Sequence, residues 1–349
     1  MKVLFIDARS GGDFTMDAVL AGLVLKLGPE NVVRWPPQKK HREGIPITTG
    51  DKERDYGAER RSLCYTSLND RLIDYSKNEV NELLKNHEID YVFVDERLES
   101  FQLYLETFAR FYKTKIIVIA GHDKFNNERV TPSTLFYMYE NLFLSFVDNW
   151  RPQYDQLKNV RPMSYAANFD HLWDVENREK YLSEKVYDIF FMGYNSNKSR
   201  AKIIDHVARK YSKLNNTLFV ECRPDTFDSF VMKRDYFRTM AQSKICINLN
   251  GDAECGKALR FYEIPYVGSF MLSQRFAGKQ VHPFVDNEHC VYFSDLFELD
   301  KCIDIALEDE EEREKIANAG HEHLTRYHTA LARVNYMFEE LNGQTSVIR

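Results

Sequence analysis

Arg260 and Glu263 are charged residues inside a segment whose other positions are mostly apolar, "ALRFYEIPYVG". Placing an ionised carboxylate in such a run costs free energy unless another group pairs with it. On a helix, the spacing of three puts both side chains on one face, where they can form a surface salt bridge. Glu263 could instead accept hydrogen bonds from the hydroxyl groups of a ligand. Pro265 and Gly268 are expected to end this helix close to the core, which favours a ligand.

Small polar and basic residues follow the apolar run "YDIFFMGY". Gly193 leads into Lys198 and Arg200 at the expected start of a helix, where backbone N–H groups and two cations can bind a phosphate. An ordinary turn has the same pattern. The run "KICINLN" ends in a similar way and leads into the helix of Arg260. The sequence therefore predicts a nucleotide-binding site made of Gly193, Asn195, Lys198, Arg200, Asn250, Lys257, Arg260 and Glu263.

Two further candidate sites lie in the first half of the chain. The run "IIVIAGHD" delivers His122 and Asp123 at the end of an expected strand, where a histidine can donate a hydrogen bond, carry a proton or be purely structural. The opening "IDARSGGD" offers a loop that could admit a substrate or be an ordinary turn. This second candidate consists of Ser10, Gly11, Gly12 and Asp13.

The composition of the chain and the motifs that it lacks argue against several classes of protein function. The 349 residues carry a net charge of -6, which argues mildly against a nucleic-acid binder. The six cysteines lack a C-x-x-C pair and are expected to be free thiols in a reducing cytoplasm. The sequence shows no zinc, nucleophile-elbow, P-loop or dinucleotide G-x-G-x-x-G motif. With no signal peptide or membrane span expected, we predict a cytoplasmic protein whose membrane association could only be peripheral.

Apolar runs alternate with amphipathic segments, which predicts an α/β fold with two largely parallel sheets. Helices are expected at 15–27, 99–112, 134–146, 198–211 and 228–242, and Gly320 is expected to end a helix near the C-terminus. The alternation restarts near residue 185, so the pattern predicts two Rossmann-like domains with a cleft between them. Ligands of such sheets bind beyond the carboxyl ends of the strands. The expected divisions are an N-terminal domain at 1–168, a connection at 169–184, a second domain at 185–327 and a C-terminal helix at 328–349 that could pack back toward the N-terminal domain.

The order of these segments resembles the GT-B glycosyltransferases, and within them the CgeB-like, glycosyl transferases group 1 type. The similarity is strongest over 185–341, where "YDIFFMGYNSNKSR", "YFRTMAQSKICINLN" and "ALRFYEIPYVGSFMLSQ" resemble family segments in the same order. The resemblance implies two facing Rossmann-like domains. The C-terminal domain would hold a nucleotide-diphosphate sugar, with UDP or GDP as the expected nucleotide. The N-terminal domain would bind an acceptor, which could be a glycan, a small molecule, a protein or a nucleic acid. The loop at residues 10–13 would lie on this acceptor side.

Residue by residue, the resemblance implies that Glu263 binds the ribose hydroxyls and that Arg260 lies near the diphosphate. His122, with Asp123, would approach the donor sugar. The spacing between Glu254 and Glu263 is longer than that of the paired glutamates in related families, so Glu254 receives no role.

The implied activity is sugar transfer that retains the anomeric configuration and uses side-chain cations in place of a metal or other cofactor. Two alternatives stay open: a sugar-nucleotide 2-epimerase, and a catalytically silent sugar-nucleotide-binding protein. The sequence does not indicate an oligomeric state.

Overall fold

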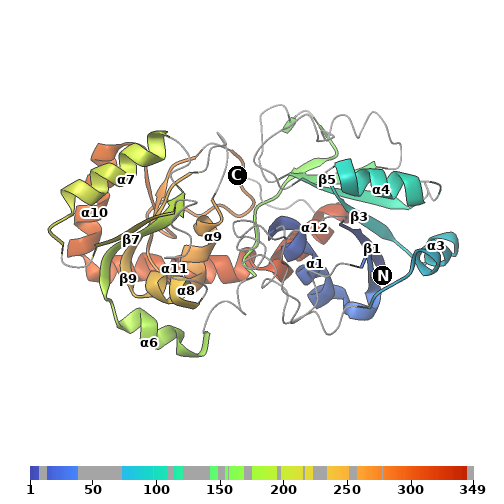
Figure 1. Ribbon diagram of the computed structural model, residues 1–349, viewed down its shortest axis with the longest axis horizontal. Helices are drawn as coiled ribbons and strands as arrows, with labels where there is room; N and C mark the ends of the chain where they lie inside the picture. The colour runs from blue at the N-terminus through green and yellow to red at the C-terminus, as the bar shows by residue number, and fades with distance from the viewer. Residues whose placement is uncertain are drawn as a thin grey trace. The chain divides into compact units, whose positions relative to one another are not determined.

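The computed structural model describes residues 1–7, 14–37, 73–96, 98–108, 110, 114–120, 142–147, 154–155, 157–168, 175–194, 198–214, 217–222, 234–250, 258–276 and 278–343. The chain forms two compact units (Figure 1). The first contains Met1–Asn168, Gly278–His282 and Thr329–Arg349, and the second contains Phe169–Ala277 and Pro283–His328. The last helix of the chain therefore belongs to the first unit.

Among the described residues, the first unit is built on a six-stranded sheet in which all neighbouring strands are parallel. The strands are apolar along most of their length because a parallel sheet is usually covered on both faces. In spatial order they are β2 (Val32–Trp35), β1 (Val3–Ile6), β3 (Tyr91–Asp95), β4 (Lys115–Ala120), β5 (Leu142–Val147) and β6 (Val160–Pro162).

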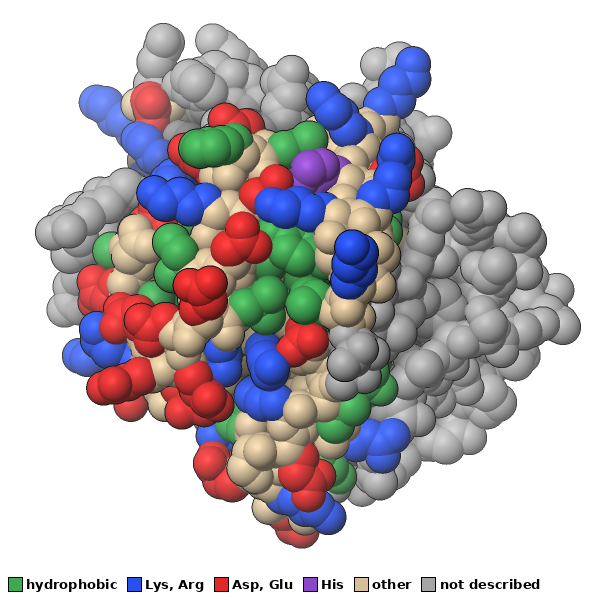
Figure 2. Space-filling model, turned by 90° about the vertical axis from the view of Figure 1, so that its left-hand side faces the viewer, with side chains coloured by type: hydrophobic (Ala, Val, Ile, Leu, Met, Phe, Trp, Pro, Cys, Tyr) green, Lys and Arg blue, Asp and Glu red, His purple; other side chains and the backbone are tan. Residues whose placement is uncertain are grey.

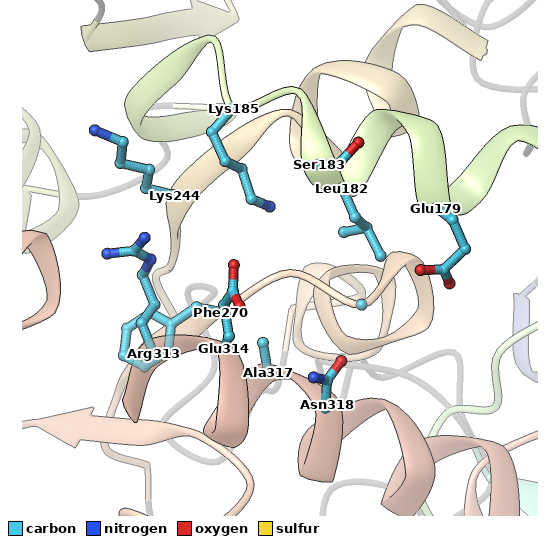
Figure 3. A pocket seen from close by; sticks show the side chains of 11 residues that line it. Glu179, Leu182, Ser183, Lys185, Lys244, Phe270, Arg313, Glu314, Ala317 and Asn318 are labelled. Atoms are coloured by element: carbon cyan, nitrogen blue, oxygen red, sulfur yellow. The ribbon is translucent and has the colours of Figure 1, made fainter. Parts of the chain in front are cut away.

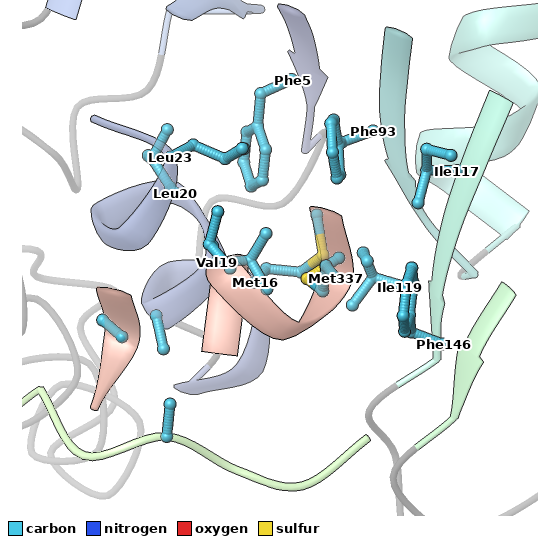
Figure 4. Packing of buried hydrophobic residues seen from close by; sticks show 14 of the residues in the cluster. Phe5, Met16, Val19, Leu20, Leu23, Phe93, Ile117, Ile119, Phe146 and Met337 are labelled. Atoms are coloured by element: carbon cyan, nitrogen blue, oxygen red, sulfur yellow. The ribbon is translucent and has the colours of Figure 1, made fainter. Parts of the chain in front are cut away.

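Helices of the first unit complete its core. They are α1 (Phe14–Leu27), α3 (Lys77–Lys85), α4 (Leu98–Phe108) and α12 (Ala330–Leu341), with a 3-10 turn at Pro29–Asn31. Figure 4 shows Met337 of α12 packed among side chains of α1 and of strands β1, β3, β4 and β5. A Cβ atom on Gly22 of α1 would collide with the carbonyl oxygen of Ala330. The glycine thus allows the first and last helices to pack closely.

The expected helix at 134–146 is wrong in its described part, because Leu142–Val147 form β5. This strand pairs with β4 on one side and β6 on the other. The six residues "LFLSFV" are nearly all apolar, and such a short run fits a buried strand as well as a helix. Pairing on both edges satisfies the backbone N–H and C=O groups of the strand.

The second unit is built on a parallel sheet with five strands in the part of the chain that is described. In spatial order they are β11 (Val291–Phe293), β10 (Met271–Gln274), β9 (Ser243–Asn248), β7 (Tyr187–Tyr194) and β8 (Thr217–Cys222). The chain moves outward in opposite directions from the β7–β9 pair, which makes this pair the topological switch point. The carboxyl end of such a pair is the usual ligand position in an open α/β sheet.

Helices cover this second sheet. They are α6 (Arg178–Ser183), α7 (Lys198–Lys210), α8 (Arg234–Ala241), α9 (Arg260–Val267), α10 (Leu296–Glu308) and α11 (Glu310–Tyr327), and a 3-10 turn at Val175–Asn177 precedes α6. Asp300 of α10 joins this helix to α7. Its Oδ1 lies 2.9 Å from His206 Nε2, and its Oδ2 lies 3.1 Å from Lys210 Nζ. The side of the second unit in Figure 2 carries acidic and basic side chains close together.

Two expected helix ends are wrong. Gly320 lies inside α11, where an added Cβ would collide with the carbonyl oxygen of His289. This glycine therefore serves close packing. Pro265 lies inside α9, which continues to Val267 and ends at Gly268 with φ 87°. Gly268 ends the helix as expected, because its left-handed backbone is one that glycine adopts readily.

The predicted α/β class with two parallel sheets is confirmed. Among the helices that the structure describes, we find none with the length and apolar character needed to cross a bilayer.

Candidate active site at the carboxyl edge of the second sheet

Helix α9 is buried over most of its surface, and its charged residues lie at its first turn. Phe261, Tyr262, Ile264 and Val267 are all buried. The helix follows β9 in the chain, so its first turn lies at the carboxyl edge of the sheet. Because the surrounding side chains are apolar, Arg260 and Glu263 must find partners among the few polar groups of this edge.

Arg260 reaches across to the end of β7. Its Nη2 donates a hydrogen bond to the carbonyl oxygen of Met192, and its guanidinium lies 4.8 Å from the centre of the Phe191 ring. A Cβ atom at Gly193 would stand 2.7 Å from Nη2, so a larger residue there would require the guanidinium to shift. The Nε and Nη1 atoms of Arg260 are buried and have no hydrogen-bond partner among the described residues. A buried guanidinium with two such donors is suited to an anion.

Glu263 is only 2% exposed. Its Oε2 accepts a hydrogen bond of 2.6 Å from the phenol of Tyr236, which lies in α8 and is also buried. The described ion pairs of the second unit do not join Arg260 to Glu263, so the surface salt bridge is not the arrangement observed. The carboxylate is instead held by a neighbouring helix.

Arg200 of α7 holds the end of β9 in place. Its Nη2 donates to the carbonyl oxygens of Leu249 at 3.1 Å and Asn250 at 2.5 Å. Asn250 also contacts the end of β10, since its backbone N–H donates to Gln274 Oε1 and its Nδ2 donates to the carbonyl oxygen of Arg275. Lys198 is exposed at the start of α7. Arg200 thus acts on the backbone of the candidate site.

The structure brings five of the predicted residues to one edge of the second sheet, namely Gly193, Arg200, Asn250, Arg260 and Glu263. Other predicted residues lie outside the described residues: Ser10, Gly11, Gly12, Asp13, His122, Asp123, Asn195 and Lys257.

Two partners of these residues were not among the predicted site residues. Tyr236 lies on the buried face of α8 with Phe237 and Met240, where its spacing is typical of a core residue. Its phenol, on an otherwise apolar face, is the signal that indicates a buried polar partner. The carbonyl oxygen of Met192 belongs to the backbone, and side-chain patterns in the sequence do not indicate it.

Residues 200–339 match a family model described as glycosyl transferase-like. This segment includes Arg200, Asn250, Arg260 and Glu263 of the candidate site, together with Tyr236. A search of curated proteins finds no match.

Solved structures with the same fold include glycosyltransferases. HepE from Anabaena, in complex with UDP and glucose, is 13% identical with a TM-score of 0.55, and the alignment covers 98% of this chain and 100% of that chain. A glycosyltransferase from Rickettsia africae is 12% identical with a TM-score of 0.57 and 98% coverage of both chains. A putative UDP-N-acetylglucosamine 2-epimerase from Listeria monocytogenes is 15% identical with a TM-score of 0.53, covering 100% of this chain and 99% of that chain. At such identities the likeness shows the fold.

The chain therefore has the GT-B fold of glycosyltransferases, and its residues 200–339 form a glycosyl transferase-like region that contains most of the candidate site.

Proposed function

We propose that this protein is a glycosyltransferase that moves a sugar from a nucleotide-diphosphate sugar to an acceptor. The observation that carries the proposal is Arg260, whose Nε and Nη1 are buried without described partners beside Gly193. They lie at the switch point of the second sheet, where a nucleotide phosphate is expected, and Arg260 belongs to the segment that matches the glycosyl transferase-like model.

Arg260 would stabilise the leaving group of the reaction. When the bond between the anomeric carbon and the diphosphate breaks, positive charge develops on the sugar ring and negative charge on the departing phosphate oxygens. A guanidinium held by Met192 and packed on Phe191 is already oriented, so it needs little rearrangement as that charge grows. Lys198, at the start of α7, would add positive charge, and the sequence prediction gives Lys257 the same role.

Glu263 would bind the ribose of the donor. A carboxylate accepts hydrogen bonds from both ribose hydroxyls, and the Tyr236 phenol holds one of its oxygens. HepE was crystallised with UDP and glucose, which supports UDP as the nucleotide here, with GDP as the other expectation.

The finer assignments follow the resemblance to the CgeB-like transferases. We include in the proposal retention of the anomeric configuration, charge stabilisation by side chains in place of a metal or cofactor, and His122 with Asp123 near the donor sugar. The acceptor would be bound by the first unit, including residues 10–13, and could be a glycan, a small molecule, a protein or a nucleic acid. The proposed location is the cytoplasm, with peripheral membrane contact allowed.

The proposal is tested by the affinity for nucleotide sugars. A thermal-shift screen of UDP-, GDP-, ADP-, CMP- and dTDP-sugars identifies the donor, and calorimetry then measures its Kd. Arg260→Met should weaken binding by about tenfold or more, because charge-assisted hydrogen bonds contribute about 1.5–3 kcal/mol. Gly193→Ala should have a similar effect by displacing the guanidinium, whereas Arg326→Met, an exposed arginine of α11, should bind like the unchanged protein.

Unchanged affinity in Arg260→Met and Gly193→Ala, with both proteins folded, would contradict the site assignment. Transfer itself is tested by a separate assay. Release of free nucleotide that depends on an added acceptor would establish it.

The alternative function is sugar-nucleotide 2-epimerisation, because a putative 2-epimerase shares the fold. Incubating UDP-N-acetylglucosamine alone and following the sugar protons by NMR separates the two. Appearance of the 2-epimer without an acceptor would favour the epimerase.

A further inference from the structure

A pocket lies at the edge of the second sheet where the strands begin, opposite the carboxyl edge that carries the candidate active site. Its volume is about 210 Å³, and Figure 3 shows the side chains around it. Lys185 stands just before β7, Lys244 lies near the start of β9, and Phe270 directly precedes β10. Helices α6 and α11 supply the other walls. The pocket is therefore separate from the carboxyl-edge site.

The ammonium group of Lys185 contacts backbone oxygens and makes no close ion pair with a described residue, although the negative charge of Glu314 acts on it across the pocket. Its Nζ donates hydrogen bonds to the carbonyl oxygens of Ala241 at 2.8 Å and Ser243 at 3.3 Å. Within the described ranges, no carboxylate lies within ion-pair distance of it. Burial, aided by the positive charge of Arg313, lowers the pKa of Lys185. The ammonium group has three donors, so one remains for a ligand in the pocket, toward which the side chain extends in Figure 3.

Two other cations line the pocket beside Lys185. Arg313 is buried and donates to the carbonyl oxygen of Ala306 at 2.6 Å. Lys244 is turned toward Asp188, 2.7 Å away. Arg313 Nη2 also lies 3.6 Å from Glu310 Oε1. The charges of Arg313 and Lys244 are thus both balanced by carboxylates, and Lys185 is the cation that would meet an anionic group.

Groups that can bind hydroxyls line the rest of the pocket. Figure 3 shows the Glu314 carboxylate directed into it from α11, with Asn318 on the same helix and Glu179 on α6. Leu182, Phe270 and Ala317 add apolar surface. A simple anion would meet the two carboxylates, and a neutral sugar would leave Lys185 without its counter-charge. A molecule with one anionic group and several hydroxyls satisfies both.

We propose that this amino-edge pocket binds a small phosphorylated sugar, with the phosphate on Lys185 and the sugar hydroxyls on Glu314, Glu179 and Asn318. The C–H faces of the sugar ring would pack on the apolar side chains. This binding is independent of the proposed sugar transfer and goes beyond it.

The experiment is calorimetric titration of the full chain with glucose 6-phosphate as the probe, without added nucleotide sugar. Glucose 6-phosphate should bind at least about tenfold more tightly than inorganic phosphate or glucose, because each of these lacks one half of the interactions. Lys185→Met should abolish the binding. Lys180→Met changes an exposed lysine of α6 outside the pocket and is the matched control, which should bind normally. Glu314→Gln should weaken glucose 6-phosphate binding while leaving phosphate binding unchanged or stronger.

Several results would overturn the proposal: no binding of glucose 6-phosphate, equal affinity for inorganic phosphate, or equal binding by Lys185→Met and the unchanged protein. Lys185→Met keeps the length of the side chain but removes the donor to the carbonyl oxygens of Ala241 and Ser243, so a lower melting temperature is expected and circular dichroism checks that the variant is folded. If it fails to fold, Glu314→Gln on the exposed side of α11 carries the test alone. Arg260→Met should keep glucose 6-phosphate binding, which separates this test from that of the proposed function.

Discussion

The Tyr236 phenol and the Glu263 carboxylate form a buried hydrogen bond of 2.6 Å that fixes which way the carboxylate faces. A carboxylate on a single helix turn could rotate about several bonds. The hydrogen bond from α8 holds one oxygen of the carboxylate and so limits this rotation. Tyr236 is therefore expected to act through Glu263 as a positioning residue.

We expect Tyr236→Phe to weaken UDP binding by about three- to tenfold, since one hydrogen bond to a charged group is lost. The preference for UDP over 2′-deoxy-UDP should shrink in the same variant, because the ribose contact loses its orientation. Calorimetry with both nucleotides measures the ratio. Tyr211→Phe is the matched control, because the Tyr211 phenol contacts Asp304 at 2.9 Å between α7 and α10. An unchanged ratio in Tyr236→Phe would show that the phenol is only structural.

At the scale of the elements, Gly320 shows how a helix can require glycine at an interior position. Glycine normally destabilises a helix by about 1 kcal/mol relative to alanine. Here α11 passes so close to the carbonyl oxygen of His289 that a side chain would push the two segments apart.

Gly320→Ala is therefore expected to lower the free energy of unfolding by about 1–3 kcal/mol, against the usual direction for this substitution in a helix. Urea unfolding followed by circular dichroism measures the change. Glu322→Ala, an exposed position of the same helix, should alter stability by less than about 0.5 kcal/mol. A more stable Gly320→Ala would mean that the packing at His289 relaxes freely.

The periodicity of apolar residues predicts the helices and strands of this chain well where it extends over many residues, as in α7. It predicts them less well where the segment is short. The six residues of β5 have no period that separates strand from helix, and their partners β4 and β6 decide the outcome. Pro265 and Gly320 look like helix ends locally, but tertiary contacts override them. The candidate site shows the same limit: the sequence indicates Arg260, whereas its partner at Met192 lies far back along the chain.

At the scale of the whole molecule, partly buried histidines make stability depend on pH. His321 contacts the carbonyl oxygen of Pro265 at 2.9 Å, and burial lowers the pKa of His321 below its ordinary value of 6.5. Burial lowers the pKa of His289 as well. In the unfolded chain these imidazoles take up protons at a higher pH than in the folded chain. Stability is thus fully present above pH 6.5 and is lost as the pH falls through the folded pKa values.

We expect the melting temperature of the second unit to fall as the pH decreases below 6.5, as measured by scanning calorimetry. His321→Gln should flatten this dependence, since glutamine can donate to Pro265 without titrating. His87→Asn, at an exposed position of the first unit, should leave it unchanged. If the melting temperature depends on pH equally in His321→Gln and in the unchanged protein, the effect comes from other groups.

The position of α12 in the chain sets an order for folding during synthesis. Its side chains Val334, Met337 and Leu341 belong to the same core cluster as β1 and α1, which are made first. Every described element of the second unit leaves the ribosome before α12 does. The second unit can therefore be complete on the nascent chain while the first still exposes apolar surface, and the core around β1 closes only after α12 has been made.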